Sequence, residues 1–318
     1  MVASAPRPAP SASLIDPQAL MNIRSLALRA RAVVEGFLHG LHRSPYHGFS
    51  VEFTEYRPYT AGDDPRYLDW RVLARSDRYF LKKYEDETNL RCHLLVDHSR
   101  SMDYGTRGYT KARYAATLAA TLAYFLHLQG DAVGLLTFDE KVRDFLPARH
   151  RPGHLRQLMF ALEKPARGRA TDLASPLERI TSLVRKRGLV VLVSDFLAPL
   201  DRLERDLLTL TACGHEVTVF QVLDPAELNL GLDQAALFED AESGRTLYLD
   251  PATARAGYVK KLDAHCAALR ASCRKLGIGY HLLAADQPLE IALFEFLQER
   301  MTRGRRFRPA ARHTGGPR

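Results

Sequence analysis

Five short apolar runs, each separated from the next by a helix-like pattern, constrain the fold of this chain most strongly. The runs are CHLLVD (92–97), AVGLLTF (132–138), LVVLVSD (189–195), EVTVFQVL (216–223) and IGYHLLAA (278–285). Short continuous apolar runs are typical of parallel strands that are buried on both faces. Helical patterns alternate with them near 110–129, 153–163, 173–186, 199–213 and 254–276. The sequence therefore predicts an α/β fold, with a doubly wound, mostly parallel sheet covered by helices.

The segments on either side of this pattern predict three further parts of the chain. Residues 1–16 are rich in alanine, serine and proline and predict a disordered leader. Residues 17–90 predict a helix that starts at Asp16-Pro17 and runs to about residue 40, followed by a small β-containing subdomain. We expect the main α/β domain over 91–303 and a disordered basic tail over 304–318.

The net charge of +8 comes almost entirely from one end of the chain. Seven arginines and no acidic residue lie between Arg300 and Arg318, which leaves +1 for the other 299 residues. A tail of this kind either stays solvated or contacts nucleic acid or anionic lipid. The sequence does not predict a basic face on the folded domain, and nucleic acid is expected as a partner only through the tail.

Cysteine usage and hydropathy predict a cytoplasmic protein. Cys92, Cys213, Cys266 and Cys273 form no CxxC pair and are interpreted as buried free thiols of a reducing compartment. The N-terminus lacks the apolar segment of a signal peptide. No stretch of 18 consecutive apolar residues is present, so no membrane span is predicted.

Polar oxygen-bearing side chains follow two of the apolar runs. Asp97, Ser99 and Ser101 follow the first run, Asp195 ends another, and Thr171 precedes a helix. The carboxyl ends of parallel strands meet at one edge of a sheet, so these groups are expected to lie close together. Oxygen ligands favour Mg²⁺, with Mn²⁺ or Ca²⁺ as alternatives. The competing interpretation is structural, with the serines in a turn and the threonine as a helix cap.

The same residues carry a resemblance to a known family. DHSRSM, ATDL and VSDF, in this order, resemble the metal-ion-dependent adhesion site of von Willebrand factor A domains. The segments GFSVEFTEYRPYTAGDDPRYLDWRVLAR and FEDAESGRTLYLD resemble a bacterial branch, the domain-of-unknown-function family fifty-eight. The resemblance implies a von Willebrand A/Rossmann-like fold and a MoxR-type AAA+ ATPase as partner. It also implies the metal-site residues Asp97, Ser99, Ser101, Thr171 and Asp195.

These patterns lead to one expected function and two alternatives. We expect a non-enzymatic, metal-dependent adaptor that captures an acidic residue of a partner or client protein through Mg²⁺. The alternatives are a metal-dependent hydrolase that acts on phosphoesters and a nucleic-acid-associated protein that uses the arginine-rich tail. The chain contains no GxSxG elbow and no P-loop, which argues against a serine hydrolase and against ATP hydrolysis by the chain itself.

Overall fold

The computed structural model describes residues 14–43, 55–58, 80–83, 90–166, 174–184, 186–231, 236–239 and 246–306. The chain divides into two compact units. One unit contains residues 1–12 and 39–89, and the other contains residues 13–38 and 90–318. The described part of the first unit includes an antiparallel strand pair, β1 (Glu55–Pro58) and β2 (Phe80–Lys83).

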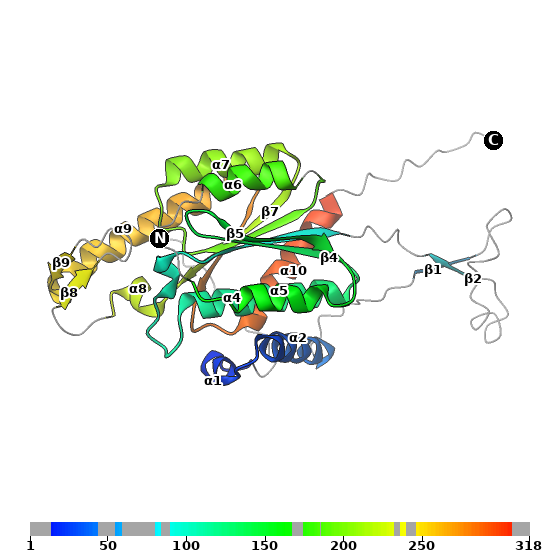
Figure 1. The fold of residues 1–318 in the computed structure, drawn as a ribbon, viewed down its shortest axis with the longest axis horizontal. Helices are drawn as coiled ribbons and strands as arrows, with labels where there is room; N and C mark the ends of the chain where they lie inside the picture. The colour runs from blue at the N-terminus through cyan, green and yellow to red at the C-terminus, as the bar shows by residue number, and fades with distance from the viewer. Residues whose placement is uncertain are drawn as a thin grey trace, which may run out of the picture. The chain divides into compact units, whose positions relative to one another are not determined.

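A six-stranded sheet forms the centre of the second unit (Figure 1). Its strands are β3 (Arg91–Asp97), β4 (Ala132–Phe138), β5 (Val142–Arg149), β6 (Leu189–Ser194), β7 (Glu216–Leu223) and β10 (Gly279–Ala284). The spatial order is β10-β7-β6-β3-β4-β5, and every neighbouring pair is parallel except β4 with β5. If the six strands are numbered 1 to 6 in chain order and the sheet is followed from β5 to β10, the order is 3-2-1-4-5-6, which is that of a doubly wound sheet. The predicted fold class, an α/β fold with a doubly wound, mostly parallel sheet, is confirmed.

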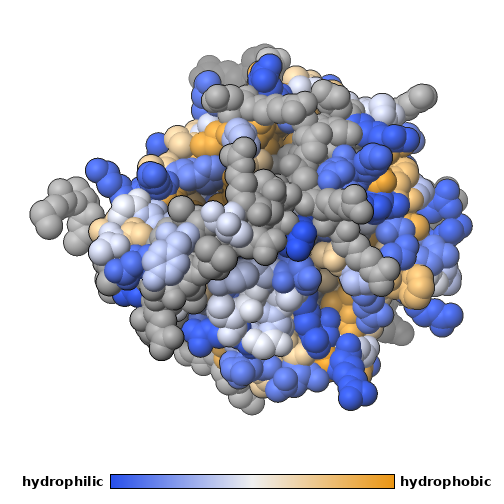
Figure 2. All heavy atoms as spheres, turned by 60° about the vertical axis from the view of Figure 1, so that its left-hand side comes forward, coloured by the Kyte–Doolittle hydropathy of each residue, from blue (hydrophilic) through white to orange (hydrophobic). Residues whose placement is uncertain are grey.

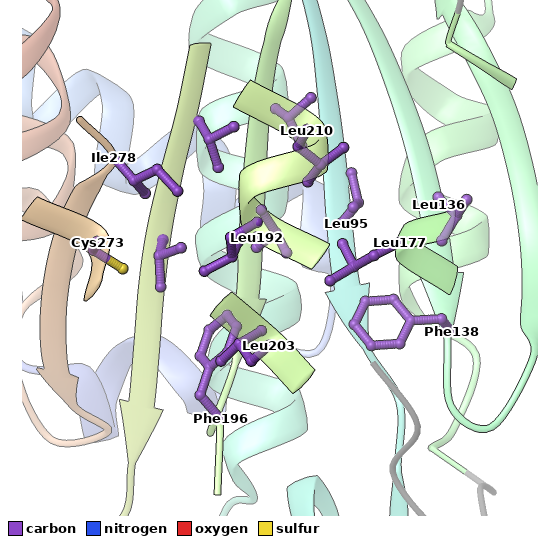
Figure 3. Close-up of a cluster of buried hydrophobic side chains, with 14 of the residues drawn as sticks. Leu95, Leu136, Phe138, Leu177, Leu192, Phe196, Leu203, Leu210, Cys273 and Ile278 are labelled. Carbon is purple, nitrogen blue, oxygen red and sulfur yellow. The ribbon is translucent and has the colours of Figure 1, made fainter. Parts of the chain in front are cut away.

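Helices cover both faces of this sheet (Figure 1). One face carries α4 (Lys111–Leu128), α5 (His154–Leu162) and α10 (Leu289–Arg306). The other face carries α6 (Ala174–Leu183), α7 (Leu200–Ala212) and α9 (Pro251–Lys275). Strand residues Leu95 and Leu192 meet Leu203 and Leu210 of α7 in a core without exposed side chains (Figure 3). Burial of a leucine of this kind contributes about 1.5–3 kcal/mol, so these layers hold the strand ends in fixed positions.

The expected first helix is two helices rather than one. Helix α1 (Pro17–Asn22) is capped by Asp16, whose carboxylate accepts from the Gln18 and Ala19 amides. The chain then turns through Ile23, whose backbone is extended, before α2 (Leu26–Arg43) begins. The Arg29 guanidinium donates to the carbonyls of Ile23 and Arg24, and this contact satisfies the acceptors that a continuous helix would have used.

The five predicted strands and the predicted hairpin are present in the structure. The edge strand β5 is an additional strand that the sequence pattern did not predict. Its half-buried and exposed side chains do not alternate regularly, and Pro147 lies within the strand. Its pairing with β4 is also interrupted by two register shifts. These irregularities are common in edge strands and remove the period-2 signal. The predicted hairpin is present as β8 (Ala236–Glu239) and β9 (Thr246–Leu249), which pair antiparallel.

Two further expectations are tested by burial and hydropathy. Cys92, Cys266 and Cys273 are buried free thiols, whereas Cys213 is exposed because it follows the last turn of α7 at the surface. The interpretation of all four cysteines as buried was therefore wrong for one of them. None of the described helices is both long enough and apolar enough to cross a bilayer.

Candidate metal centre

The candidate site lies where the strand order of the sheet reverses. Strands β3 and β6 are adjacent although they are far apart in sequence, and Val96 pairs with Val193 in their register. Asp97 is the last residue of β3, and Asp195 directly follows β6. In open parallel sheets, ligands bind outside the carboxyl ends of the strands at such a reversal point. The fold thus brings two aspartates to the position where a ligand is expected.

Ser99 and Ser194 hold the Asp97 carboxylate through hydrogen bonds. The Ser99 amide donates to Asp97 Oδ1 at 2.8 Å, and the Ser194 hydroxyl donates to Asp97 Oδ2 at 2.5 Å. The hydroxyls of Ser99 and Ser101 lie 3.1 Å apart. Asp97, Ser99 and Ser194 have no exposed surface. Sequence reasoning did not include Ser194, whose approach to Asp97 depends on the pairing of two strands distant in sequence.

A buried lysine, which sequence reasoning also missed, contacts the second aspartate. Lys111 is the first residue of α4, after the N-cap Thr110, and its side chain has no exposed surface. The Lys111 ammonium lies 2.9 Å from Asp195 Oδ2 and 2.7 Å from Glu227 Oε1. The available signal was a lysine at the start of a helix whose following residues are largely alanine, leucine and other apolar types. Such a lysine is rarely buried unless it is paired.

The short helix α8 (Pro225–Asn229) supplies Glu227 and is itself anchored to the site loop. Asp224 caps α8 by accepting from the Ala226 amide, and Glu227 accepts from the Asp224 amide, which completes a capping box. Asp224 also accepts from the amide and the hydroxyl of Thr106, at 2.9 and 2.6 Å. The loop that follows Ser101 is therefore tied to the end of β7.

The electrostatics of the site indicate excess negative charge. Burial and repulsion from Asp195 raise the pKa of Asp97 to about 7, although hydrogen bonds from Ser194 and Ser99 act in the opposite direction. Burial lowers the pKa of Lys111, but the attraction of Asp195 and Glu227 is larger and the net direction is upward. Three carboxylates and one ammonium leave a formal charge of −2 when all are ionised. One divalent cation would neutralise that charge.

The turn after Asp195 is held in an unusual conformation. Phe196 has a φ of 51°, in the left-handed region, and its side chain is fully buried. A left-handed conformation costs a non-glycine residue about 1–2 kcal/mol, so packing must hold it. The Asp195 carbonyl accepts from the Gln221 side chain at 2.8 Å, and Gln221 in turn accepts from the Tyr280 hydroxyl at 2.6 Å. Buried contacts on neighbouring strands thus fix the backbone beside the Asp195 carboxylate.

The side chains at the candidate site offer oxygen atoms, which are the ligands that a hard divalent cation prefers. Asp97, Ser99, Ser101 and Asp195 all offer oxygen, which Mg²⁺ prefers. Within the described ranges, no three His, Cys, Asp or Glu side chains form a ready ligand cluster. A cation here would therefore depend on the serine hydroxyls as well as on the carboxylates. Thr171, and Asp172 beside it, lie outside the described residues, so their place relative to the site stays a prediction.

Comparisons with known proteins find relatives over most of the chain. A family model described as "Protein of unknown function DUF58" matches residues 55–268. The uncharacterized protein Rv1480 of Mycobacterium tuberculosis is 31% identical over 291 residues, which are 90% of this chain and 90% of that protein. The uncharacterized protein Mb1516 of Mycobacterium bovis matches with the same identity and coverage.

Solved structures show weaker likenesses. An aerotolerance-related membrane protein from Bacteroides fragilis is 14% identical, with a TM-score of 0.47 over 67% of this chain and 99% of that one. BatB from Bacteroides thetaiotaomicron is also 14% identical, with a TM-score of 0.45 and the same coverage of both chains. The strand order described above, rather than these likenesses, defines the fold.

Proposed function

The chain belongs to the DUF58 family of proteins of unknown function, and from its candidate metal centre we propose that it is a non-enzymatic protein-binding module. In this proposal a divalent cation, Mg²⁺ in the first place, binds between the Asp97 and Asp195 carboxylates. The cation then captures an acidic side chain of a partner protein. The observation that carries the proposal is the convergence of two buried aspartates and a hydroxyl pair at the reversal point of the sheet.

Ligand count explains why a partner would complete the site. Asp97, Ser99, Ser101 and Asp195 offer at most four side-chain ligands, directly or through water, and Thr171 is the expected fifth from the sequence. Mg²⁺ requires six ligands in octahedral geometry and loses its waters reluctantly. At least one position is then left for water or for a carboxylate from outside. When bound, the cation would supply a fixed positive charge that recognises such a carboxylate.

The surroundings of the site support binding to a protein surface. Tyr104 is 40% exposed and Leu197 is 44% exposed, and they follow the two site segments by a few residues. Figure 2 shows one face of the molecule, on which hydrophilic side chains are interspersed with smaller hydrophobic areas. Mixed surfaces of this kind, with a few apolar anchors, are typical of non-obligate protein interfaces.

The contacts of the polar groups support binding rather than chemistry. The hydroxyls of Ser99 and Ser101 lie against each other, and the Lys111 ammonium is engaged by two carboxylates. A nucleophilic serine would need a base within hydrogen-bond reach, and a lysine base would need to be neutral. We retain a metal-dependent phosphoesterase as the second candidate function, because two carboxylates and a divalent cation are also the components of such enzymes.

The partner in this proposal is a MoxR-type AAA+ ATPase or its client, as the resemblance in sequence implies. The test is capture of the purified ATPase by the immobilised protein in Mg²⁺ and in EDTA. We expect capture only in Mg²⁺ and its loss in Asp97→Ala, whereas Asp103→Ala, a nearby exposed acid outside the site, should behave as wild type. Undiminished capture by Asp97→Ala would contradict the proposal. Phosphoester turnover that needs Mg²⁺ and Asp97 would favour the second candidate.

A further inference from the structure

A pocket lined by arginines lies between the N-terminal helix α1 and the loop that precedes α4. Its volume is about 280 Å³, and neither the sequence patterns nor the candidate metal centre accounts for it. Its described lining is almost entirely polar or basic: Gln18, Met21, Asn22, Arg24, Arg107, Gly108, Tyr109 and Arg113. None of these lining residues is acidic.

The three guanidinium groups have few partners of their own. Arg107 reaches Asp286 at 3.2 Å across the surface. Arg113 donates through Nη2 to the Met21 carbonyl at 2.5 Å, while its buried Nε has no hydrogen-bond partner. Arg24 is exposed, and its carbonyl, rather than its side chain, accepts from Arg29. The pocket therefore holds three positive charges, and Asp286 and Asp16, which both act electrostatically on the lining residue Tyr109, offset only part of them.

The nearby buried Arg29 experiences the positive charge of Arg113, which lines the pocket. Arg29 is 4% exposed, and burial, together with repulsion from Arg113, lowers its pKa to about 10. Burial is the larger of these two causes, and the nearby Glu163 carboxylate acts in the opposite direction. An anion bound beside Arg113 would act in the opposite sense and relieve the repulsion.

The loop on one side of the pocket is fixed by hydrogen bonds to the carboxyl edge of the sheet. The Tyr109 hydroxyl donates to the Ala285 carbonyl, just after β10, at 2.8 Å. The neighbouring Thr106 is held by Asp224 after β7. The loop between the candidate metal centre and α4 is thus anchored at both strand ends. Arg107, which lies between the two anchors, is presented from a fixed backbone.

We propose that this pocket binds a phosphate-type oxyanion, carried by a small molecule or by a phosphorylated side chain of a partner protein. A guanidinium forms two parallel hydrogen bonds with phosphate oxygens, and clusters of arginine are the usual means of recognising phosphorylated groups. A phosphate also offers more acceptor oxygens to the three guanidinium groups than a single carboxylate does. The amides of Gln18 and Asn22 add neutral donors at the same pocket.

The test is a titration of the full chain with inorganic phosphate, followed by calorimetry, in EDTA so that no cation bridges the anion to the protein. We expect saturable binding that is about a hundredfold weaker in the double variant Arg24→Gln/Arg107→Gln, because each of the two lost charge-assisted contacts costs on the order of one power of ten. Arg113→Lys, which keeps the charge but loses the planar fork, should also weaken binding. Both outcomes are independent of the proposed cation.

The matched control is Arg274→Gln, which removes one positive charge from the exposed last turn of α9, outside the pocket lining. It should bind phosphate as wild type does. Absence of saturable binding in wild type, or equal weakening by Arg274→Gln, would overturn the proposal. Titration with AMP and with a phosphoserine peptide then identifies the carrier: tighter binding of one than of inorganic phosphate assigns the small molecule or the partner protein.

Discussion

The Lys111 ammonium lies 2.9 Å from the Asp195 carboxylate, and both side chains are almost completely buried. A fixed cation therefore already neutralises part of the charge at the candidate metal centre. In the folded protein the negative charge of Asp195 is therefore compensated without a metal ion. Lys111 shares its charge with Glu227, so a divalent ion would be added to this arrangement rather than replace it.

Replacement of Lys111 by methionine should make the stability of the protein depend on metal. The change leaves the buried Asp195 and the partly exposed Glu227 without their counter-ion, which should lower the free energy of unfolding by about 3–5 kcal/mol in EDTA. Mg²⁺ should restore part of this loss. Urea unfolding with and without Mg²⁺ measures both effects, and Lys260→Met, on the exposed face of α9, is the control. Equal stability of the two variants in EDTA would contradict this account.

Replacement of Ser194 by alanine should weaken cation binding although Ser194 is not among the expected ligands. Its hydroxyl positions the Asp97 carboxylate through the 2.5 Å hydrogen bond. Loss of groups that orient a metal ligand costs about 10–100-fold in affinity. Titration with Mn²⁺, followed by electron paramagnetic resonance, should show that Ser194→Ala binds the ion at least about tenfold more weakly than wild type. Ser182→Ala on the exposed part of α6 should leave the affinity unchanged.

His281 should make the stability of the protein fall as the pH rises above neutral. Burial lowers the pKa of His281, but hydrogen bonds to Glu295 and Glu299 outweigh it and raise the pKa to about 9. A histidine whose pKa is higher in the folded state contributes its full stabilisation of the folded protein at pH values below its unfolded pKa of about 6.5. This stabilisation is lost as the pH rises through the pKa of the folded state. The loss between about pH 6.5 and 9 amounts to about 3 kcal/mol at most.

The measurement for this prediction is urea unfolding at several pH values between 6 and 10. His281→Gln should be less stable than wild type at pH 6 and should show a flatter dependence on pH, because the charged partner of the two glutamates is gone. Parallel curves for the two proteins would rule out this role. His265, whose ring contacts the Phe196 carbonyl, is a suitable control position.

Alanine at Gly105 should disturb the loop that links the metal centre to α4. A Cβ there would overlap the Tyr109 carbonyl and the Thr110 backbone, which cannot move without releasing the N-cap of α4. We expect a stability loss and faster amide hydrogen exchange over residues 104–110. Gly257→Ala is the matched control, because its Cβ meets nothing and alanine favours a helix by about 0.5–1 kcal/mol. An undisturbed loop in Gly105→Ala would show that the close approach is not essential.

The sequence predicts those parts of this fold that depend on local pattern. The central strands have continuous apolar runs, and the position of Asp97 and Asp195 at strand ends follows from them. Lys111 and Ser194 were missed because their roles depend on contacts with segments distant in sequence. The arginine pocket was missed for the same reason, since α1 and the loop before α4 lie about 90 residues apart in the chain.

The sequence separation of 97 positions from Asp97 to Ser194 also has a consequence for synthesis of the protein. A ribosome adds about 5–20 residues per second, so β3 exists for roughly 5–20 s before β6 has been made. During that interval the Asp97 carboxylate and one hydrogen-bonding edge of β3 have no partner from β6. The nascent chain must stay in solution until β6 arrives, and the candidate metal centre is complete only after that point.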